Sequence, residues 1–168
     1  KHRRRQRQMC IRDRIDTLLE SGCWPFIKQR PFDIIADPLQ NPKSIFISCF
    51  DSAPLSVDFE FILKDQIEKF KYGLKILDKI TPGNLNIGVN KNQEFLNKEL
   101  ENFNKNIFSG PHPSGNVGVQ IHHIDPINVG ESVWVIRPED VCIIGNLFLC
   151  GEFLSLIHIS EPTRQLQI

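Results

Sequence analysis

The chain has 168 residues, of which 40% are hydrophobic, and its 20 basic side chains balance 20 acidic ones. This length predicts about one domain with a buried core, and there is no run of 18 apolar residues that would span a membrane. Cys23, Cys49, Cys142 and Cys150 show no CxxC spacing, which excludes the common zinc and redox motifs and is typical of reduced core cysteines in a cytosolic protein.

The two ends differ in character from the rest of the chain. RRQRQMCIRD (4–13) and LSLIHISEPTR (154–164) match translated sequencing-adapter DNA, so residues 1–14 and 154–168 are expected to be artefacts outside the domain. The alternative is a native basic arm and a native tail. Residues 15–153 alone carry 12 basic and 18 acidic side chains, a net charge of −6. An acidic domain has no electrostatic attraction to nucleic acid, and none is predicted as a partner.

The first half of the chain predicts a helix, an irregular segment, a strand and a second helix. IDTLLESGCW (15–24) has the pattern of a short helix that ends at Gly22, and the proline-punctuated residues 25–43 predict no regular element. SIFISCF (44–50) is a nearly continuous apolar run, as in a strand that is buried on both faces. Apolar residues at helical spacing predict a helix over 63–80.

The second half continues this alternation. Strands are expected over 84–89, 106–108 and 132–136, and helices over 93–103, from about 114 and from 138. The order predicts an α/β fold with a Rossmann-like, open and mostly parallel sheet joined by crossover helices. Such sheets bind ligands beyond the carboxyl ends of their strands. DSAP (51–54) and GPHPSG (110–115) both follow predicted strands and are therefore expected at the same edge.

GPHPSGNVGVQIHHIDP (110–126) gathers glycines, prolines, histidines and an aspartate. A zinc site is not predicted, because His122 and His123 are adjacent and would point in different directions on a helix. A phosphate cradle has weak support, since the glycine patterns of nucleotide-binding loops are absent and prolines donate no amide hydrogen. No GxSxG pattern surrounds Ser114 to indicate a nucleophile. The simplest interpretation is a rigid turn that leads into a helix, with one of the two histidines facing the core.

Four blocks in the same order carry a family resemblance: SGCWPFIKQRPF (21–32), SIFISCFDSAPL (44–55), the 110–126 block, and VWVIRPEDVCIIGNLFLCGEF (133–153). Together they resemble the A subunit of the Na⁺-translocating NADH:quinone oxidoreductase. The resemblance covers 15–153 and implies the central α/β domain of a longer protein, similar in fold to the flavin-carrying subunit of respiratory complex I. Cys23, Lys28 and Ser114 depart from the residues usual in that family.

The resemblance implies a peripheral subunit on the cytoplasmic face of the inner membrane. It would belong to a complex that couples NADH oxidation and ubiquinone reduction to Na⁺ export, with the other subunits of the complex as partners. No cofactor is expected in this chain, because NADH oxidation, flavin and iron–sulfur chemistry are assigned to other subunits. The isolated fragment is expected to be inactive. Two functions stay open, a contribution to a quinone site and a non-catalytic scaffold with a degenerate flavin site.

The candidate site residues fall into two groups, and no metal site or catalytic residue is assigned. Candidates for contact with quinone or another ligand are Gly110, Pro111, His112, Pro113, Gly115, His122, His123 and Asp125. The histidines could donate hydrogen bonds or relay protons. A second region comprises Trp24, Arg30 and Asp51, the first two of which align with the flavin-holding region of the complex I relative. Packing of Trp24 and an Asx-turn at Asp51 are the structural alternatives.

Overall fold

The computed structural model describes residues 11–151. Residues 1–10 and 152–168 lie outside the described part. Most of the two segments predicted to be adapter sequence therefore lies outside it as well. Residues 11–14 form the first turn of helix α1 (Ile11–Glu20). The assignment of 1–14 and 154–168 to adapter sequence stays a prediction.

The described residues form an open, mixed and mostly parallel sheet with the strand order β2-β1-β6-β3-β4-β5. β3, β4, β5 and β6 run parallel to their sheet neighbours among these four, whereas β1 is antiparallel to both β2 and β6. The α/β class and the largely parallel sheet predicted from the sequence are confirmed. The strands are β1 (Lys28–Arg30), β2 (Ile34–Ile35), β3 (Ser44–Ser48), β4 (Asn84–Asn90), β5 (Lys105–Phe108) and β6 (Val133–Val135).

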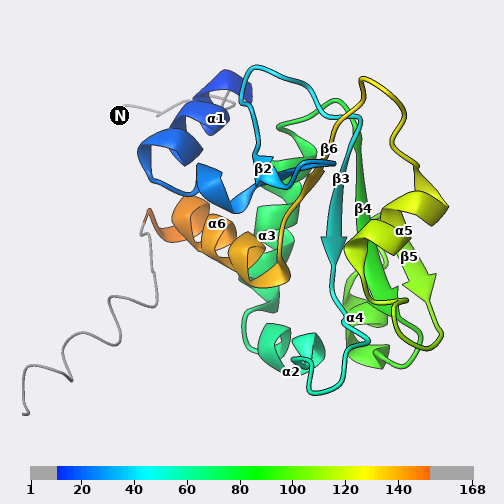
Figure 1. Cartoon of the computed structure of the whole chain (residues 1–168). Helices are drawn as coiled ribbons and strands as arrows, with labels where there is room; N and C mark the ends of the chain where they lie inside the picture. Colours follow the sequence, from blue (N-terminus) through cyan, green and yellow to red (C-terminus); the bar gives the residue numbers. More distant parts are fainter. Residues whose placement is uncertain (1–10, 152–168) are drawn as a thin grey trace, which may run out of the picture.

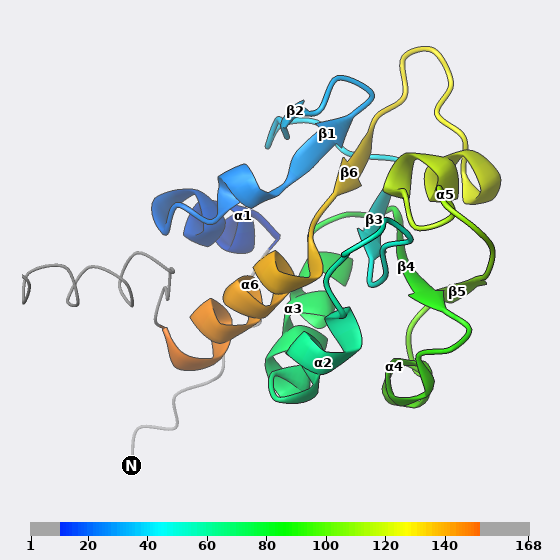
Figure 2. The ribbon, with the colours of Figure 1, turned by 60° about the horizontal axis from the view of Figure 1, so that its bottom comes forward.

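Helices cover the two faces of the sheet unequally. α1, α3 and α6 lie on one side of the sheet and α5 lies on the other (Figures 1 and 2). No helix of the described part is long and apolar enough to cross a lipid bilayer. Besides α1, the helices are α2 (Phe59–Lys64), α3 (Ile67–Asp78), α4 (Glu94–Glu99), α5 (Val117–Ile124), α6 (Pro138–Cys150) and the 3-10 turn η1 (Trp24–Phe26).

β3 is buried on both faces, as its apolar run predicts. Ile45 and Ile47 belong to the larger core, which also contains the inner faces of α1, α3, α4 and α6. Phe46 points to the opposite side and packs with Ile121 of α5 and with Val133. The alternation of side chains along a strand therefore supplies both layers from one segment.

α3 and α6 pack closely at a pair of glycines. A Cβ atom added at Gly145 of α6 would lie 1.9 Å from the carbonyl oxygen of Lys69, and one added at Gly73 of α3 would lie 2.3 Å from that of Val141. Both contacts are to backbone, which cannot rotate away. The absence of a side chain at each position is what lets the two helices approach, and this contact anchors α6 behind β6.

Two sequence predictions about the first half are wrong in part. No regular element is predicted over 25–43, yet this segment contains η1, β1 and β2. A three-residue strand is too short to show a period of two, and its pairing with β6 is a tertiary event. The helix expected over 63–80 begins earlier and is interrupted, because α2 ends at Lys64 and α3 starts at Ile67. The Asp58 side chain caps α2 by accepting from the N–H groups of Glu60 and Phe61.

Candidate functional site

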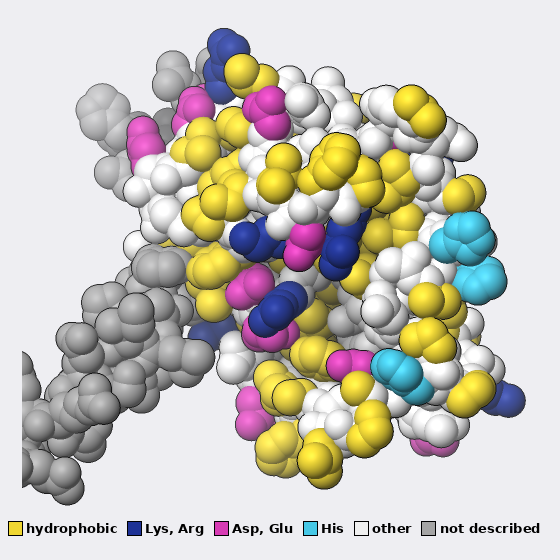
Figure 3. Space-filling view, in the orientation of Figure 1, with side chains coloured by type: hydrophobic (Ala, Val, Ile, Leu, Met, Phe, Trp, Pro, Cys, Tyr) yellow, Lys and Arg dark blue, Asp and Glu magenta, His cyan; other side chains and the backbone are white. Residues whose placement is uncertain are grey.

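The carboxyl ends of β3 and β6 border a cleft of about 890 Å³. The chain runs outward from β3 through β4 to β5 and then returns to β6 on the other side of β3, so the strand order reverses between β3 and β6. Open α/β sheets bind ligands at this kind of reversal. Figure 3 shows a hollow near the centre of this face, where basic and acidic side chains meet among apolar ones.

Four segments that are distant in sequence supply the walls of the cleft. Phe50 and Asp51 follow β3, and residues 136–140 follow β6. β1 adds Lys28 and Arg30, which pair with Val135 and Val133 of β6 and therefore share their face of the sheet. The fourth segment is the glycine–proline loop, residues 110–116, together with the start of α5. His112 and Asn116 are among the residues of this loop that line the cleft.

The glycine–proline loop is held against the end of β3 by close backbone contact. The Gly115 N–H donates to Ser52 Oγ at 2.9 Å, and Ser52 Oγ lies 3.2 Å from His112 Nδ1. A Cβ atom at Gly115 would meet the Ser52 nitrogen at 2.3 Å. Asp51 Oδ1 accepts from the Ala53 N–H at 3.0 Å and so forms the Asx-turn expected from the sequence. The prediction that 51–54 and 110–115 share an edge of the sheet is confirmed.

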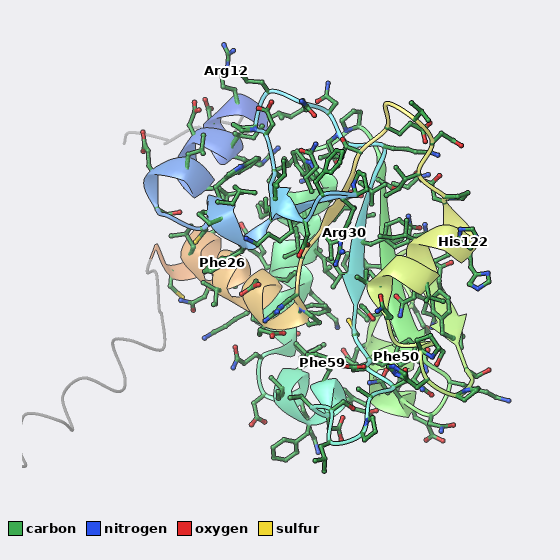
Figure 4. All side chains as sticks on the ribbon, viewed as in Figure 1. Arg12, Phe26, Arg30, Phe50, Phe59 and His122 are labelled. Atoms are coloured by element: carbon green, nitrogen blue, oxygen red, sulfur yellow. The ribbon has the colours of Figure 1, made fainter. Side chains whose placement is uncertain are left out.

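Aromatic rings and hydrogen-bond donors both line the cleft. Phe26, Phe50 and Phe59 all line it, and in Figure 4 Phe26 lies to the left of Arg30 while Phe50 and Phe59 lie below it. Arg30 Nε lies 3.4 Å from Asp33 Oδ1, at the rim. Flat apolar walls with a few convergent donors suit a planar ligand that carries oxygen acceptors.

Arg137, Glu139 and Asp140 add a second charged group at the start of α6. Burial raises the pKa of Asp140 to about 6, and the charge of Glu139 adds to the increase, while Arg137 and Lys28 act in the opposite direction. The lining thus combines three cations with four carboxyl groups, of which that of Asp140 is partly desolvated. Such perturbed groups in a cleft are a common property of functional sites.

Asp140→Asn is expected to stabilise the domain at neutral pH. The pKa of Asp140 rises from 3.8 to about 6 on folding, so the unfolded chain loses this proton first and stability falls as pH rises from about 4 to 6. A shift of two pKa units corresponds to a change of roughly 3 kcal/mol in the free energy of unfolding, and because Asp140 is partly exposed to solvent we expect about 1 kcal/mol. Urea unfolding at pH 7.5 and pH 4 measures this difference, with Asp16→Asn on the exposed side of α1 as the control. An equal effect at both pH values would contradict the assignment.

The structure brings together residues from both sequence-predicted groups. His112 and Gly115 of the first group line the same cleft as Arg30 and Asp51 of the second. Trp24 is not among the lining residues. It is 3% exposed, its indole N–H donates to the Ala36 carbonyl at 2.7 Å, and its ring meets Trp134 edge-on at 5.5 Å. The packing interpretation of Trp24 is therefore the one that its contacts support.

The remaining predicted residues lie apart from the cleft. His122 and His123 are both exposed, so the expectation that one of them faces the core is wrong, and Figure 4 shows His122 pointing outward from α5. Gly110, Pro111 and Pro113 form the exposed outer part of the loop. α5 begins at Val117, after its Asn116 cap, rather than near Ser114.

Asp125 lies at the opposite, amino edge of the sheet. Its Oδ1 is 2.7 Å from Lys43 Nζ and its Oδ2 accepts from Ser44 Oγ at 2.9 Å, at the start of β3. Hydrogen bonds to Asp125 and then to Glu131 raise the pKa of Lys43. These contacts tie the end of α5 to β3, which assigns Asp125 a structural role. Within residues 11–151, no cluster of three or more His, Cys, Asp or Glu side chains could hold a metal ion.

Reasoning from sequence missed Ser52, Phe59, Arg137 and Asp140. A signal for Arg137 and Asp140 is present in the sequence, because both closely follow a predicted strand. The rule that ligands bind beyond the carboxyl ends of strands, which predicts a role for 51–54 and 110–115, applies to them as well. Ser52 lies inside the predicted turn 51–54, where nothing local distinguishes a hydroxyl that contacts another loop from one that faces solvent. Phe59 reaches the cleft only through the placement of α2, which no local pattern indicates.

The fold and the cleft define an open-sheet α/β domain with a ligand-sized cleft at the reversal of strand order. Comparison with known proteins narrows this class. The sequence model described as "NqrA second alpha/beta domain" matches residues 12–153, and the chain belongs to this family. The family resemblance inferred from the four sequence blocks is confirmed.

Curated relatives carry the name of the A subunit of a Na(+)-translocating NADH-quinone reductase. The chain is 36% identical to that of Pseudomonas aeruginosa over 137 residues, which are 82% of this chain and 30% of the relative. It is 34% identical to that of Alcanivorax borkumensis over 138 residues, which are 82% of this chain and 31% of the relative. It is 38% identical to that of Histophilus somni over 147 residues, which are 86% of this chain and 33% of the relative. The chain spans about a third of the length of these relatives.

Proposed function

We propose that the chain works as the second α/β domain of the A subunit of a sodium-translocating NADH–quinone reductase. In this proposal the cleft at the ends of β3 and β6 contributes to binding the head group of ubiquinone. The observation that carries it is the meeting of His112, Arg30 and three phenylalanines in one cleft. A quinone ring is flat and apolar with two carbonyl acceptors, and it needs that combination of aromatic contact and donors.

The finer parts of the proposal go beyond the family membership. The sheet is Rossmann-like and related to the flavin-carrying subunit of complex I, and the flavin site is degenerate. NADH, flavin and iron–sulfur centres belong to other subunits of the complex, which are the partners of this one. The protein lies peripherally on the cytoplasmic face of the membrane. Support for a degenerate site comes from the loop 110–115, where two prolines take the place of amide donors that a phosphate would need.

His112→Ala is expected to lower quinone reduction by the assembled complex about fivefold, the worth of one neutral hydrogen bond, with assembly retained. The measurement is the steady-state rate of quinone reduction by purified complex, together with its subunit composition. His122→Ala is the matched control, because His122 is an exposed histidine that does not line the cleft. Equal rates for the two variants would contradict a role for the cleft in quinone binding.

A scaffold function is the second candidate, and exposed apolar side chains favour it. Leu55, Val57 and Phe61, which lie before and within α2, are largely exposed, with Phe61 at 78%. Apolar side chains grouped on a surface are typical of contact with another protein. Loss of assembly in His112→Ala complex, together with loss of activity, would favour the scaffold over the quinone site.

A further inference from the structure

Ser52 links the backbone of the glycine–proline loop to the imidazole of His112. Its Oγ accepts from the Gly115 N–H at 2.9 Å and lies 3.2 Å from His112 Nδ1. The turn that carries Ser52 is itself held by Asp51, whose Oδ1 accepts from the Ala53 N–H at 3.0 Å. The hydroxyl is therefore placed from two sides, by the Asx-turn and by the Gly115 amide.

The hydrogen count at Ser52 favours one tautomer of His112. A serine hydroxyl has one hydrogen to donate and two lone pairs that accept. The Gly115 N–H occupies one lone pair, and among the hydrogen bonds of the described residues the only group that could accept the hydroxyl's hydrogen is His112 Nδ1. The arrangement that satisfies both groups has the hydroxyl donating to Nδ1. A neutral imidazole that accepts at Nδ1 carries its hydrogen on Nε2.

We propose that Ser52 is a positioning residue, which holds His112 in the tautomer with the hydrogen on Nε2 and leaves this N–H for a ligand in the cleft. His112 lines the cleft, and Nδ1 is the ring nitrogen already engaged by Ser52. The ligand class that such a donor recognises is a neutral acceptor such as a carbonyl oxygen. That this acceptor is a quinone carbonyl rests on the proposed function. The assignment of the tautomer is independent of the proposed function.

The close approach of the Gly115 backbone to Asp51 explains how the short Ser52 side chain can contact both the Gly115 amide and His112. The position that a Cβ of Gly115 would occupy lies 2.7 Å from both Asp51 Cα and the Asp51 carbonyl carbon. Loop and strand end thus meet backbone to backbone, and a short hydroxyl spans the remaining distance. A displacement of the loop would separate Oγ from Nδ1, because Ser52 has a single rotatable bond with which to follow.

The test is a two-dimensional ¹H–¹⁵N correlation of the imidazole nitrogens in the full 168-residue chain, at a pH at which the ring is neutral. His112→Gln identifies the signals of His112 among those of the five histidines. We expect the Nε2–H pattern with Nδ1 shifted upfield as a hydrogen-bond acceptor. Ser52→Ala should lose the upfield shift and give a mixture of tautomers, while Ser52→Thr, which keeps the hydroxyl, should retain the wild-type pattern.

Two results would overturn the assignment of Ser52. One is a wild-type spectrum with the hydrogen on Nδ1, and the other is the same tautomer and Nδ1 shift in wild type and Ser52→Ala. Backbone amide spectra of the variants show whether each remains folded, and Ser52→Thr provides the second test should Ser52→Ala unfold. A purely structural role would leave the imidazole pattern of folded Ser52→Ala unchanged.

Titration with a short-tailed ubiquinone analogue separates this inference from the proposed function. We expect the analogue to shift the His112 Nε2–H signal, with about fivefold weaker binding to Ser52→Ala than to Ser52→Thr. No response to the analogue, with the expected tautomer intact, would overturn the quinone proposal and support the assignment of Ser52. A response of equal affinity in both variants would overturn the positioning role.

Discussion

Gly145→Ala in α6 is expected to lower the free energy of unfolding by about 3 kcal/mol. Helix propensity alone predicts the opposite sign, since alanine is favoured over glycine in a helix interior by about 1 kcal/mol. The packing term dominates, because the new Cβ would lie 1.9 Å from the Lys69 carbonyl oxygen and 3.0 Å from the Gly73 nitrogen. Both atoms are backbone, so α3 and α6 must separate and the core between them must open.

Urea unfolding followed by far-UV circular dichroism measures this change. Gly118→Ala in α5 is the control, because the nearest atom to its new Cβ is a side-chain oxygen at 3.2 Å, that of the Asn116 cap, which need shift by only a few tenths of an ångström. We expect Gly118→Ala to be neutral or slightly stabilising. If Gly145→Ala were as stable as Gly118→Ala, the close packing of α3 on α6 would be wrong.

Gly115→Ala is expected to have the largest effect on the cleft, weakening binding of a quinone analogue by more than about tenfold. The new Cβ would lie 2.3 Å from the Ser52 nitrogen and 2.7 Å from Asp51 backbone atoms. The loop 110–116 would have to withdraw from the end of β3. The Gly115–Ser52 hydrogen bond and the Ser52–His112 contact would both be lost with it.

Calorimetric titration with the quinone analogue measures binding, and thermal unfolding shows how far stability changes. We expect a stability loss of about 2 kcal/mol, smaller than at Gly145, because the strain falls on a surface loop rather than between two core helices. Gly118→Ala again serves as the control, a short distance further along the chain. Unchanged binding by folded Gly115→Ala would show that the loop does not form the site.

Local chemistry explains why much of the fold could be predicted. The apolar run 44–50 predicts a strand covered on both faces, and Ile45, Phe46 and Ile47 are each 1% exposed or less. The alternation of helices and strands implied parallel pairing, because a helical crossover returns the next strand in the same direction. From parallel pairing it followed that 51–54 and 110–115 share an edge, and the contact of Ser52 with Gly115 confirms this.

The sequence motif around the histidines, by contrast, grouped residues that the fold separates. His112 and Asp125 lie within one block of sequence, but α5 runs from one edge of the sheet toward the other between them. His112 therefore reaches the carboxyl end of β3 near Ser52, while Asp125 pairs with Lys43 at the amino end. Closeness in sequence is lost across an element that spans the sheet.

The family is assigned from the resemblance of four sequence blocks. The α/β class, the buried strands and the edge at which the two turns meet are predicted from residue patterns, because these depend on local runs of apolar residues and on strand direction. The membership of the cleft, in contrast, was visible only in the folded chain. Arg30 reaches it through the antiparallel pairing of β1 with β6, and Phe59 reaches it through the placement of α2. Each of these depends on contacts between residues distant in sequence, for which a single chain carries no local signal.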